Sequence, residues 1–176
     1  MTTRTFLGIP VEGDINEGSK RTPQQPLEDL QPLLQALLDD DGIACFGWHQ
    51  YTPFFNDGDP CVFSASSVWV ARPEDLDPEA DEDDEPDTDG LDVSYCTHLG
   101  KYTGGEWVPD PENPGQKKKV GATYEGPDQD RYDRCLALNG AIESGAFDDV
   151  LLGAFGDHAE ITIRRSGIQV EYYGHD

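Results

Sequence analysis

Apolar residues recur at helical spacing in two segments of the chain. Five of the six leucines in residues 26–40 recur at three- and four-residue steps and form one apolar stripe, which predicts an amphipathic helix: Leu27, Leu30, Leu34, Leu37 and Leu38. Pro32 lies inside this pattern, so a kink there and a helix start near Gln31 both stay open. Residues 127–144 form the second predicted helix, because aspartates gather near its positive end and Gly145 can end it.

Alternating apolar and polar residues predict a β-hairpin in the first half of the chain. Residues 43–51 and 61–70 both alternate in the way that strands do. Between them lies Asn56-Asp57-Gly58, which is a turn signal because these residue types tolerate a positive φ. We expect a hairpin with a wide tip that carries aromatic side chains.

A second hairpin is predicted near the end of the sequence, from residues 159–164 and 167–173. Two shorter strands are expected at residues 5–11 and 91–99, whereas the Gly- and Pro-rich residues 102–126 are expected to be irregular. The buried face of the second hairpin is expected to consist of its alternate apolar residues: Ile161, Ile163, Ile168, Val170 and Tyr172.

Runs of strands with interspersed helices are typical of α+β proteins. We therefore expect an antiparallel sheet built from hairpins, with two main helices packed on one face. The length favours a single domain, residues 1–176, which is long enough to bury a core. No apolar run predicts a transmembrane helix and no signal-peptide pattern opens the sequence, so we expect a cytoplasmic protein.

The charge of the chain limits the kinds of macromolecule that we expect it to bind. The 36 acidic residues outnumber 12 basic ones and give a net charge of −24. Such a surface repels nucleic acid and anionic membranes, so the expected partner is a basic or nucleic-acid-associated protein. Adaptation to salt and a GC-rich genome produce the same acidity, and composition alone does not separate these origins from selection for a partner.

Nearly half of this charge lies in one segment. Residues 72–92 hold twelve acidic residues, one basic residue and three prolines, with hardly any apolar residue after Leu76. A segment of this composition cannot bury enough apolar surface to order itself, so we expect a mobile acidic loop within the domain.

Sequence motifs of catalysis and phosphate binding are missing: there is no nucleophile elbow, no P-loop and no dinucleotide-binding glycine motif. A metal site stays open as an alternative, because five possible ligands converge if the first hairpin pairs with residues 91–99. These ligands are Cys45, His49, Cys61, Cys96 and His98. No CxxC pair accompanies them, so we favour reduced, buried cysteines and predict no catalytic residue, metal or cofactor.

The segment from Trp48 to Cys61, WHQYTPFFNDGDPC, is the most distinctive in the chain because aromatic residues crowd a predicted hairpin tip. One interpretation is a binding hot spot rimmed by acidic residues. The other is a loop folded back onto the core, with Phe54 and Phe55 as plugs. We favour the second interpretation, because aromatic side chains are usually buried.

Two segments resemble a group of small acidic proteins from bacteria and their phages. They are WHQYTPFFNDGDPCVF, residues 48–63, and FGDHAEITIRRSGIQVEYYGHD, residues 155–176, and together they cover about a fifth of the chain. The resemblance implies a small cytoplasmic, phage-encoded protein, and it brings no assigned activity or functional residue.

We therefore expect a non-enzymatic acidic protein-binding module that acts on a host protein. One alternative is a DNA-mimic inhibitor of a basic nucleic-acid-binding protein, and another is a small metal-binding protein or enzyme that uses the Cys and His set. The candidate partner-binding residues are aromatic and acidic side chains of the hairpin tip and the acidic loop: Trp48, Tyr51, Phe54, Phe55, Asp57, Asp59, Asp81, Glu82, Asp83, Asp84 and Glu85.

Overall fold

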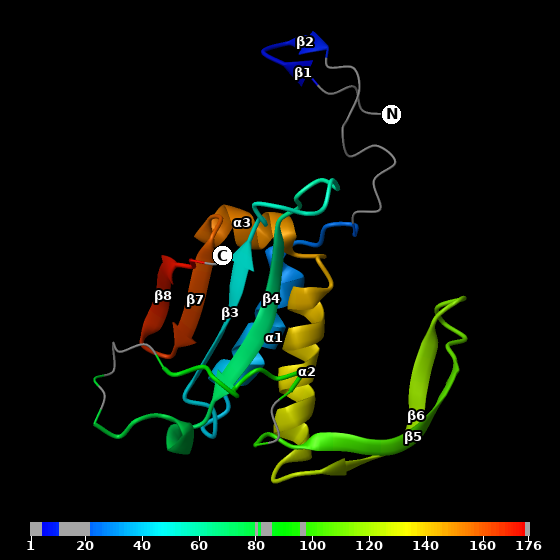
Figure 1. The fold of residues 1–176 in the computed structure, drawn as a ribbon, viewed down its shortest axis with the longest axis vertical. Coiled ribbons are helices and arrows are strands. Elements are labelled where there is room, and N and C mark those ends of the chain that lie inside the picture. Colours follow the sequence, from blue (N-terminus) through cyan, green and yellow to red (C-terminus); the bar gives the residue numbers. More distant parts are fainter. Residues whose placement is uncertain (1–4, 11–21, 80, 82–85, 96–97, 175–176) are drawn as a thin grey trace.

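The computed structural model shows a four-stranded antiparallel sheet with helices on one face, in the strand order β4-β3-β7-β8 (Figure 1). The structure describes residues 5–10, 22–79, 81, 86–95 and 98–174. The strands of this sheet are β3 (Cys45–Tyr51), β4 (Ser64–Ala71), β7 (Ala159–Arg164) and β8 (Gly167–Tyr172). The helices are α1 (Leu27–Leu38), α2 (Gln129–Glu143) and α3 (Asp148–Phe155). The predicted α+β class is confirmed.

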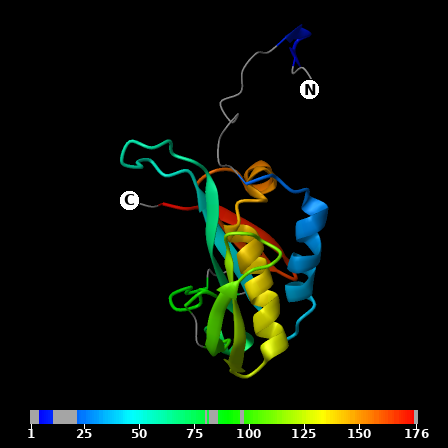
Figure 2. The ribbon, with the colours of Figure 1, turned by 90° about the vertical axis from the view of Figure 1, so that its right-hand side faces the viewer.

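The two predicted helices form the layer that covers the sheet (Figures 1 and 2). Helix α1 begins at Leu27, so Pro32 lies within the helix and does not mark its start. Helix α2 begins after Asp128, whose side chain accepts a hydrogen bond of 2.9 Å from the amide of Arg131 and so caps the helix. The apolar stripe of α1 packs inward, because Leu30 and Leu37 are fully buried.

The core fills the space between these helices and the sheet. On the sheet side it includes Phe46, Trp48, Ile161 and Ile163, which are all buried. A smaller cluster lies on the opposite face of the sheet, where Cys45, Trp69, Ala71 and Leu91 pack together with the half-buried Leu76. The chain after β4 therefore folds back and covers part of the second face.

Gly47 lies at the point where the pairing of β3 with β4 shifts register. A Cβ atom at this position would lie 1.8 Å from the main-chain oxygen of Ile161 and 2.8 Å from the ring of Trp69. Only glycine fits there, because a side chain would overlap the main chain of β7 at Ile161 and also meet the Trp69 ring.

Residues 102–126 are the clearest error of the sequence-based prediction. Two nine-residue strands, β5 (Lys101–Pro109) and β6 (Lys117–Glu125), form an antiparallel hairpin that projects from the body, and we call it the arm (Figure 1). The glycines of these strands suggested irregular structure, yet three of them have positive φ within regular pairing. Tyr102 and Tyr124 anchor the arm, because both rings lie within 6 Å of the ring of Tyr132 on α2.

The fold differs from the prediction at three further segments. The described part of residues 91–99 forms no strand and makes one isolated bridge, between Asp92 and Trp69. Residues 5–11 were expected to form one strand, but the chain there makes a short hairpin of β1 (Thr5–Phe6) and β2 (Ile9–Pro10). Helix α3 was not predicted, because it spans only eight residues.

Candidate functional site

An aromatic surface forms at the end of the sheet where β3 ends and β7 begins. It consists of Tyr51, Phe54, Phe55, His158 and Tyr173, and we refer to these five residues as the aromatic surface. The loop that carries Phe54 and the start of β7 near His158 meet because β3 and β7 pair antiparallel, with Gln50 opposite Ala159. The loop after β3 therefore lies beside the residue that precedes β7.

The rings of this surface stack on one another across the two segments. Phe54 stacks on His158 with ring centroids 4.8 Å apart, and His49 stacks on Tyr173 at 4.2 Å. Tyr51 lies between them, 5.5 Å from Tyr173 and 6.5 Å from His158. These contacts connect the rings of Phe54, His158, Tyr51, Tyr173 and His49, and Phe55 follows Phe54 in the same loop.

The two phenylalanines at the tip are exposed to solvent. The exposed fractions of Phe54 and Phe55 are 72% and 76%. The favoured interpretation of the sequence, a loop folded back with these residues as plugs, is therefore wrong. The tip instead extends beyond the body with its aromatic side chains outside.

Hydrogen bonds hold this loop in place. Asp157 accepts hydrogen bonds of 2.8 Å from the amides of Thr52 and His158 and so ties the end of β3 to the start of β7. Partial burial would raise the pKa of Asp157, but these hydrogen bonds outweigh it and keep the pKa below its usual value. At the tip, the amide of Asp59 donates to the main-chain oxygen of Asn56 at 2.7 Å, which closes the predicted turn.

Trp48 does not belong to this surface, and the prediction that it contacts a partner is wrong. Its side chain is fully buried, and its indole N–H donates to the side-chain oxygen of Gln50 at 3.1 Å. Gln50 in turn donates to the main-chain oxygens of Leu151 and Gly156, at 3.1 and 2.6 Å. Trp48 faces the helices because alternate residues of β3 point to opposite faces of the sheet, so it packs in the core.

The acidic residues that were candidates for partner binding lie at two separate places. Asp57 and Asp59 are exposed at the tip beside the two phenylalanines. Asp81 is exposed and lines a pocket on the second face of the sheet, whereas the four acids at positions 82–85 lie outside the described residues. The structure therefore brings the aromatic candidates together with Asp57 and Asp59, and leaves Asp81 elsewhere.

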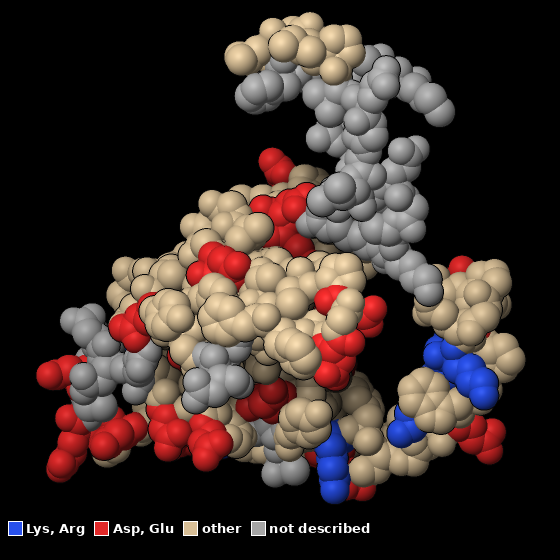
Figure 3. Space-filling model, turned by 45° about the horizontal axis from the view of Figure 1, so that its top comes forward, with Lys and Arg blue, Asp and Glu red and all other residues tan. Residues whose placement is uncertain are grey.

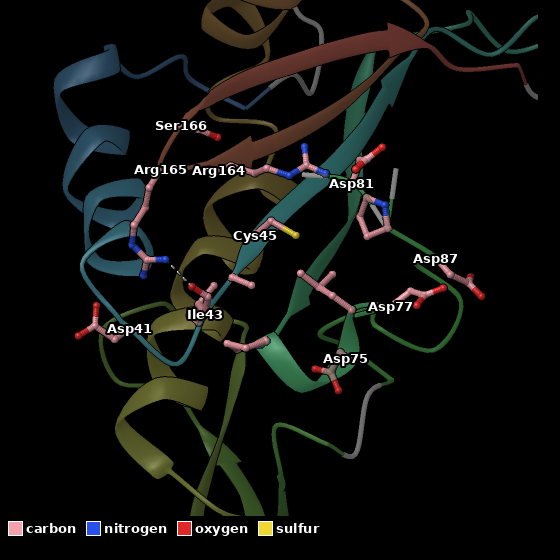
Figure 4. A pocket seen from close by; sticks show the side chains of 14 residues that line it. Asp41, Ile43, Cys45, Asp75, Asp77, Asp81, Asp87, Arg164, Arg165 and Ser166 are labelled. Carbon is pink, nitrogen blue, oxygen red and sulfur yellow. Dashed lines mark hydrogen bonds between the residues drawn. The ribbon is translucent and has the colours of Figure 1, made fainter. Parts of the chain in front are cut away.

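The pocket lies between the segment after β4 and the turn that joins β7 to β8 (Figure 4). Its volume is about 690 Å³, and its apolar part includes Ile43, Ala44, Cys45 and Leu76. Carboxylates and two arginines surround it: Asp41, Asp75, Asp77, Asp81, Asp87, Arg164 and Arg165. Arg164 points toward Asp81 in Figure 4, so acidic and basic groups are mixed within this pocket.

The Cys and His set does not converge. His49 lies 3.1 Å from Glu160, whereas His98 lies 3.3 Å from Asp75, at a different part of the sheet. Cys61 is exposed, which differs from the predicted burial, and Cys96 lies outside the described residues. Within the ranges that the structure describes, no three residues of the types Cys, His, Asp and Glu form a group suited to a metal ion.

The two buried thiols are poorly suited to act as nucleophiles. Burial raises the pKa of Cys45, and it raises the pKa of Cys135 to about 12. Both therefore stay protonated at neutral pH, whereas a reactive cysteine needs its thiolate form.

The arm carries most of the lysines and differs in charge from the rest of the molecule (Figure 3). Four of the five lysines lie on it, and they balance its four acidic residues, so residues 101–125 have no net charge. Trp107 of β5 lies opposite Lys119 and is exposed. The excess of acid therefore lies outside the arm.

Among the described residues, no helix is both long and apolar enough to cross a membrane. No family model, no curated protein and no solved structure matches this chain. The resemblance to small acidic bacterial and phage proteins stays a prediction.

Proposed function

We propose that this protein is a non-enzymatic binding module that holds a basic host protein through its aromatic surface. The observation that carries the proposal is the exposure of Phe54 and Phe55 beside the stacked ring of His158. Exposed aromatic groups that lie together mark interaction sites more often than scattered ones do. Aromatic side chains also bury a large area on binding, about 150–250 Å² each.

The hydrogen bonds of the loop support the proposal. Asp157 and Asn56 fix the loop on both sides of the phenylalanines, through the amides of Thr52 and Asp59. A surface that is already ordered loses less conformational entropy when it binds. The stacking of Phe54 on His158 fixes the side chain as well as the backbone.

Charge supports the choice of a basic partner. Asp57 and Asp59 lie exposed at the tip, on a chain with a net charge of −24. Long-range attraction of this kind accelerates association, while the buried aromatic contacts set the lifetime of the complex. The two contributions respond differently to salt, because salt screens exposed charges and leaves aromatic burial intact.

The test is a pull-down from bacterial lysate with three tagged forms of the chain. They are the wild type, the double variant Phe54→Ala/Phe55→Ala, and Trp107→Ala as a control that removes an exposed aromatic ring from the arm. We expect the wild type and the control to retain the same basic protein through a high-salt wash. The double variant should lose it, because one hot-spot residue contributes about 2 kcal/mol or more, which is about 30-fold in affinity.

Two results would contradict the proposal. If the double variant retains the partner as well as the wild type does, the aromatic surface does not bind it. If salt releases the partner equally from all three forms, charge alone holds it, as the DNA-mimic alternative predicts. Purified partner and direct measurement of the dissociation constants then give the size of each contribution.

A further inference from the structure

Strand β8 is an edge strand whose helix-side face has little cover. In the sheet formed by the described strands, its only neighbour is β7. The helices lie toward the other edge, since α2 packs on β4 and α1 packs on α2. Figure 1 shows β8 at the outer side of the sheet, away from α2.

The apolar residues of β8 point to the face on which the helices lie, yet they are not buried. Val170 pairs with Ile161 and Ile168 with Ile163, and directly paired residues share a face of the sheet. The β7 members of these pairs are in the core, but Ile168, Val170 and Tyr172 are 55%, 46% and 75% exposed. The prediction that these three residues are buried is wrong, because the helices pack toward β4 and leave the side chains of β8 largely exposed.

The main-chain N–H and C=O groups of these three residues point away from β7. The amide of Tyr173 donates to the main-chain oxygen of His158 at 2.8 Å, so Tyr173 directs its main chain toward β7. Successive residues of a strand alternate in this direction. Ile168, Val170 and Tyr172 therefore direct their N–H and C=O groups toward the open edge of the sheet.

Apart from the charge of Glu171, strand β8 lacks the features that usually protect an exposed edge. Natural edge strands carry proline, lysine or a bulge, each of which hinders the addition of another strand. Residues 167–172 contain neither proline nor lysine, and their pairing with β7 has no register shift. The edge can accept a strand without rearrangement.

We propose that β8 pairs antiparallel with β8 of a second copy of this chain, with Val170 opposite Val170 of that copy. This register places Ile168 opposite Tyr172 on the apolar face. On the other face it places Gln169 opposite Glu171, so no two carboxylates oppose each other. A continuous eight-stranded sheet results, and the two-fold axis passes beside Val170.

Charge favours a second copy over a basic partner at this edge. Residues 159–173 contain two glutamates and two arginines, so this hairpin has no net charge on a chain of net charge −24. Antiparallel pairing brings the turn that holds Arg164 and Arg165 beside the Glu171 end of the other copy. A basic protein would find no excess of acid here, whereas a second copy would meet no net repulsion from this hairpin.

The remaining charge of the molecule predicts an unusual salt dependence. Two chains of −24 repel each other outside this hairpin, and salt screens that repulsion. The dimer should therefore strengthen as salt rises, whereas a complex held by opposite charges should weaken.

Sedimentation equilibrium on the full chain tests the pairing. We expect a wild-type dimer whose affinity rises with salt. The variant Val170→Lys should weaken the dimer about tenfold or more, because it places two lysines opposite each other at the two-fold axis. Val120→Lys, the same change on the arm, should dimerise as the wild type does. Val170→Pro should also be monomeric while β7 and β8 stay paired, because it removes only an outward amide.

A cross-link tests the register without weakening the interface. In a Cys61→Ser/Cys96→Ser background, Val170→Cys should form a disulfide-linked dimer on mild oxidation, because directly opposed Cα atoms lie about 5.5 Å apart. Gln169→Cys should not, because its diagonal counterpart lies about 7–8 Å away.

Three results would overturn the proposal: a wild-type chain that stays monomeric at every salt concentration, a dimer that Val170→Lys leaves intact, or equal cross-linking at both positions. The inference does not depend on the proposed function. A Val170→Lys monomer that still retains the basic partner would leave the aromatic surface intact and separate the two.

Discussion

The carboxylate of Asp40, just beyond the end of α1, lies 3.0 Å from the side-chain nitrogen Nε of Arg131 on α2. Arg134, one turn later, bonds to the same carboxylate, and the amide of Gly42 donates to its other oxygen. The Asp40 side chain is almost fully buried between the two helices. One acidic residue of a chain with excess acid thus joins the two main helices.

Replacing Asp40 by asparagine should destabilise the fold. The substitution removes the charge while two arginines stay beside it, and the loss of one partner of a buried ion pair is strongly unfavourable. Because both arginines are partly exposed, we expect a decrease of about 2 kcal/mol in the free energy of unfolding. Urea unfolding measures it, with the exposed Asp41→Asn as the matched control.

Asp40 also predicts how stability depends on pH. Burial would raise its pKa, but the hydrogen bonds from Arg131, Arg134 and Gly42 outweigh burial and lower the pKa from 3.8 to about 2. A carboxyl group with a lowered pKa stabilises the fold above its unfolded value, and this contribution is lost as pH falls through the folded value.

The difference in unfolding free energy between the wild type and Asp40→Asn should therefore shrink as pH falls from about 4 to about 2. The pH-dependent part should amount to about 2 kcal/mol, since one pKa unit corresponds to about 1.4 kcal/mol. A difference that stays constant over this pH range would show that the ion pair does not shift the pKa.

Replacing Gln50 by leucine should lower the stability of the fold more than the similar size of the two side chains suggests. Leucine fills the volume but leaves the Trp48 indole N–H without a partner, and it removes the hydrogen bonds that Gln50 donates to the main-chain oxygens of Leu151 and Gly156. Each unpaired buried group costs about 1–3 kcal/mol, so we expect a loss of about 3 kcal/mol or more. Thermal unfolding checks it against Gln35→Leu, an exposed glutamine on α1.

Replacing Gly47 by alanine should disrupt the centre of the sheet. The new methyl group would overlap the main-chain oxygen of Ile161, which cannot move without breaking the pairing of β3 with β7. Gly153→Ala in α3 is the opposite case, because its methyl group meets no atom within 4 Å. We expect a large loss of stability at Gly47 and a gain of about 0.5–1 kcal/mol at Gly153, both from urea unfolding.

The sequence was most informative where periodicity is strong. The leucine stripe of α1 and the alternation of β3 predicted elements that the structure confirms. Helix α1 buries one regular face, whereas β3 packs alternate residues into clusters on the two faces of the sheet. Periodicity did not predict the two strands of the arm, since neither strand buries a continuous face and glycines interrupt both. Its strands are held by pairing with each other and by Tyr102 and Tyr124 at the base, which are contacts that periodicity does not report.

The candidate site was predicted in part, for a similar physical reason. The sequence identified Phe54 and Phe55 by their density in one loop, but His158 and Tyr173 come from a segment about 100 residues later. Only the antiparallel pairing of β3 with β7 brings these rings together. Trp48 was misassigned because an aromatic residue within a strand looks the same in sequence whether it faces the core or the solvent.

The central claim is that the aromatic surface, rather than charge alone, holds a partner. Its most direct test is the ratio of dissociation constants of wild type and Phe54→Ala/Phe55→Ala for the captured basic protein, measured at high salt by titration calorimetry. We predict a ratio of about 30 or more that persists as salt rises. A ratio near one would contradict the account and leave the acidic residues as the determinant of binding.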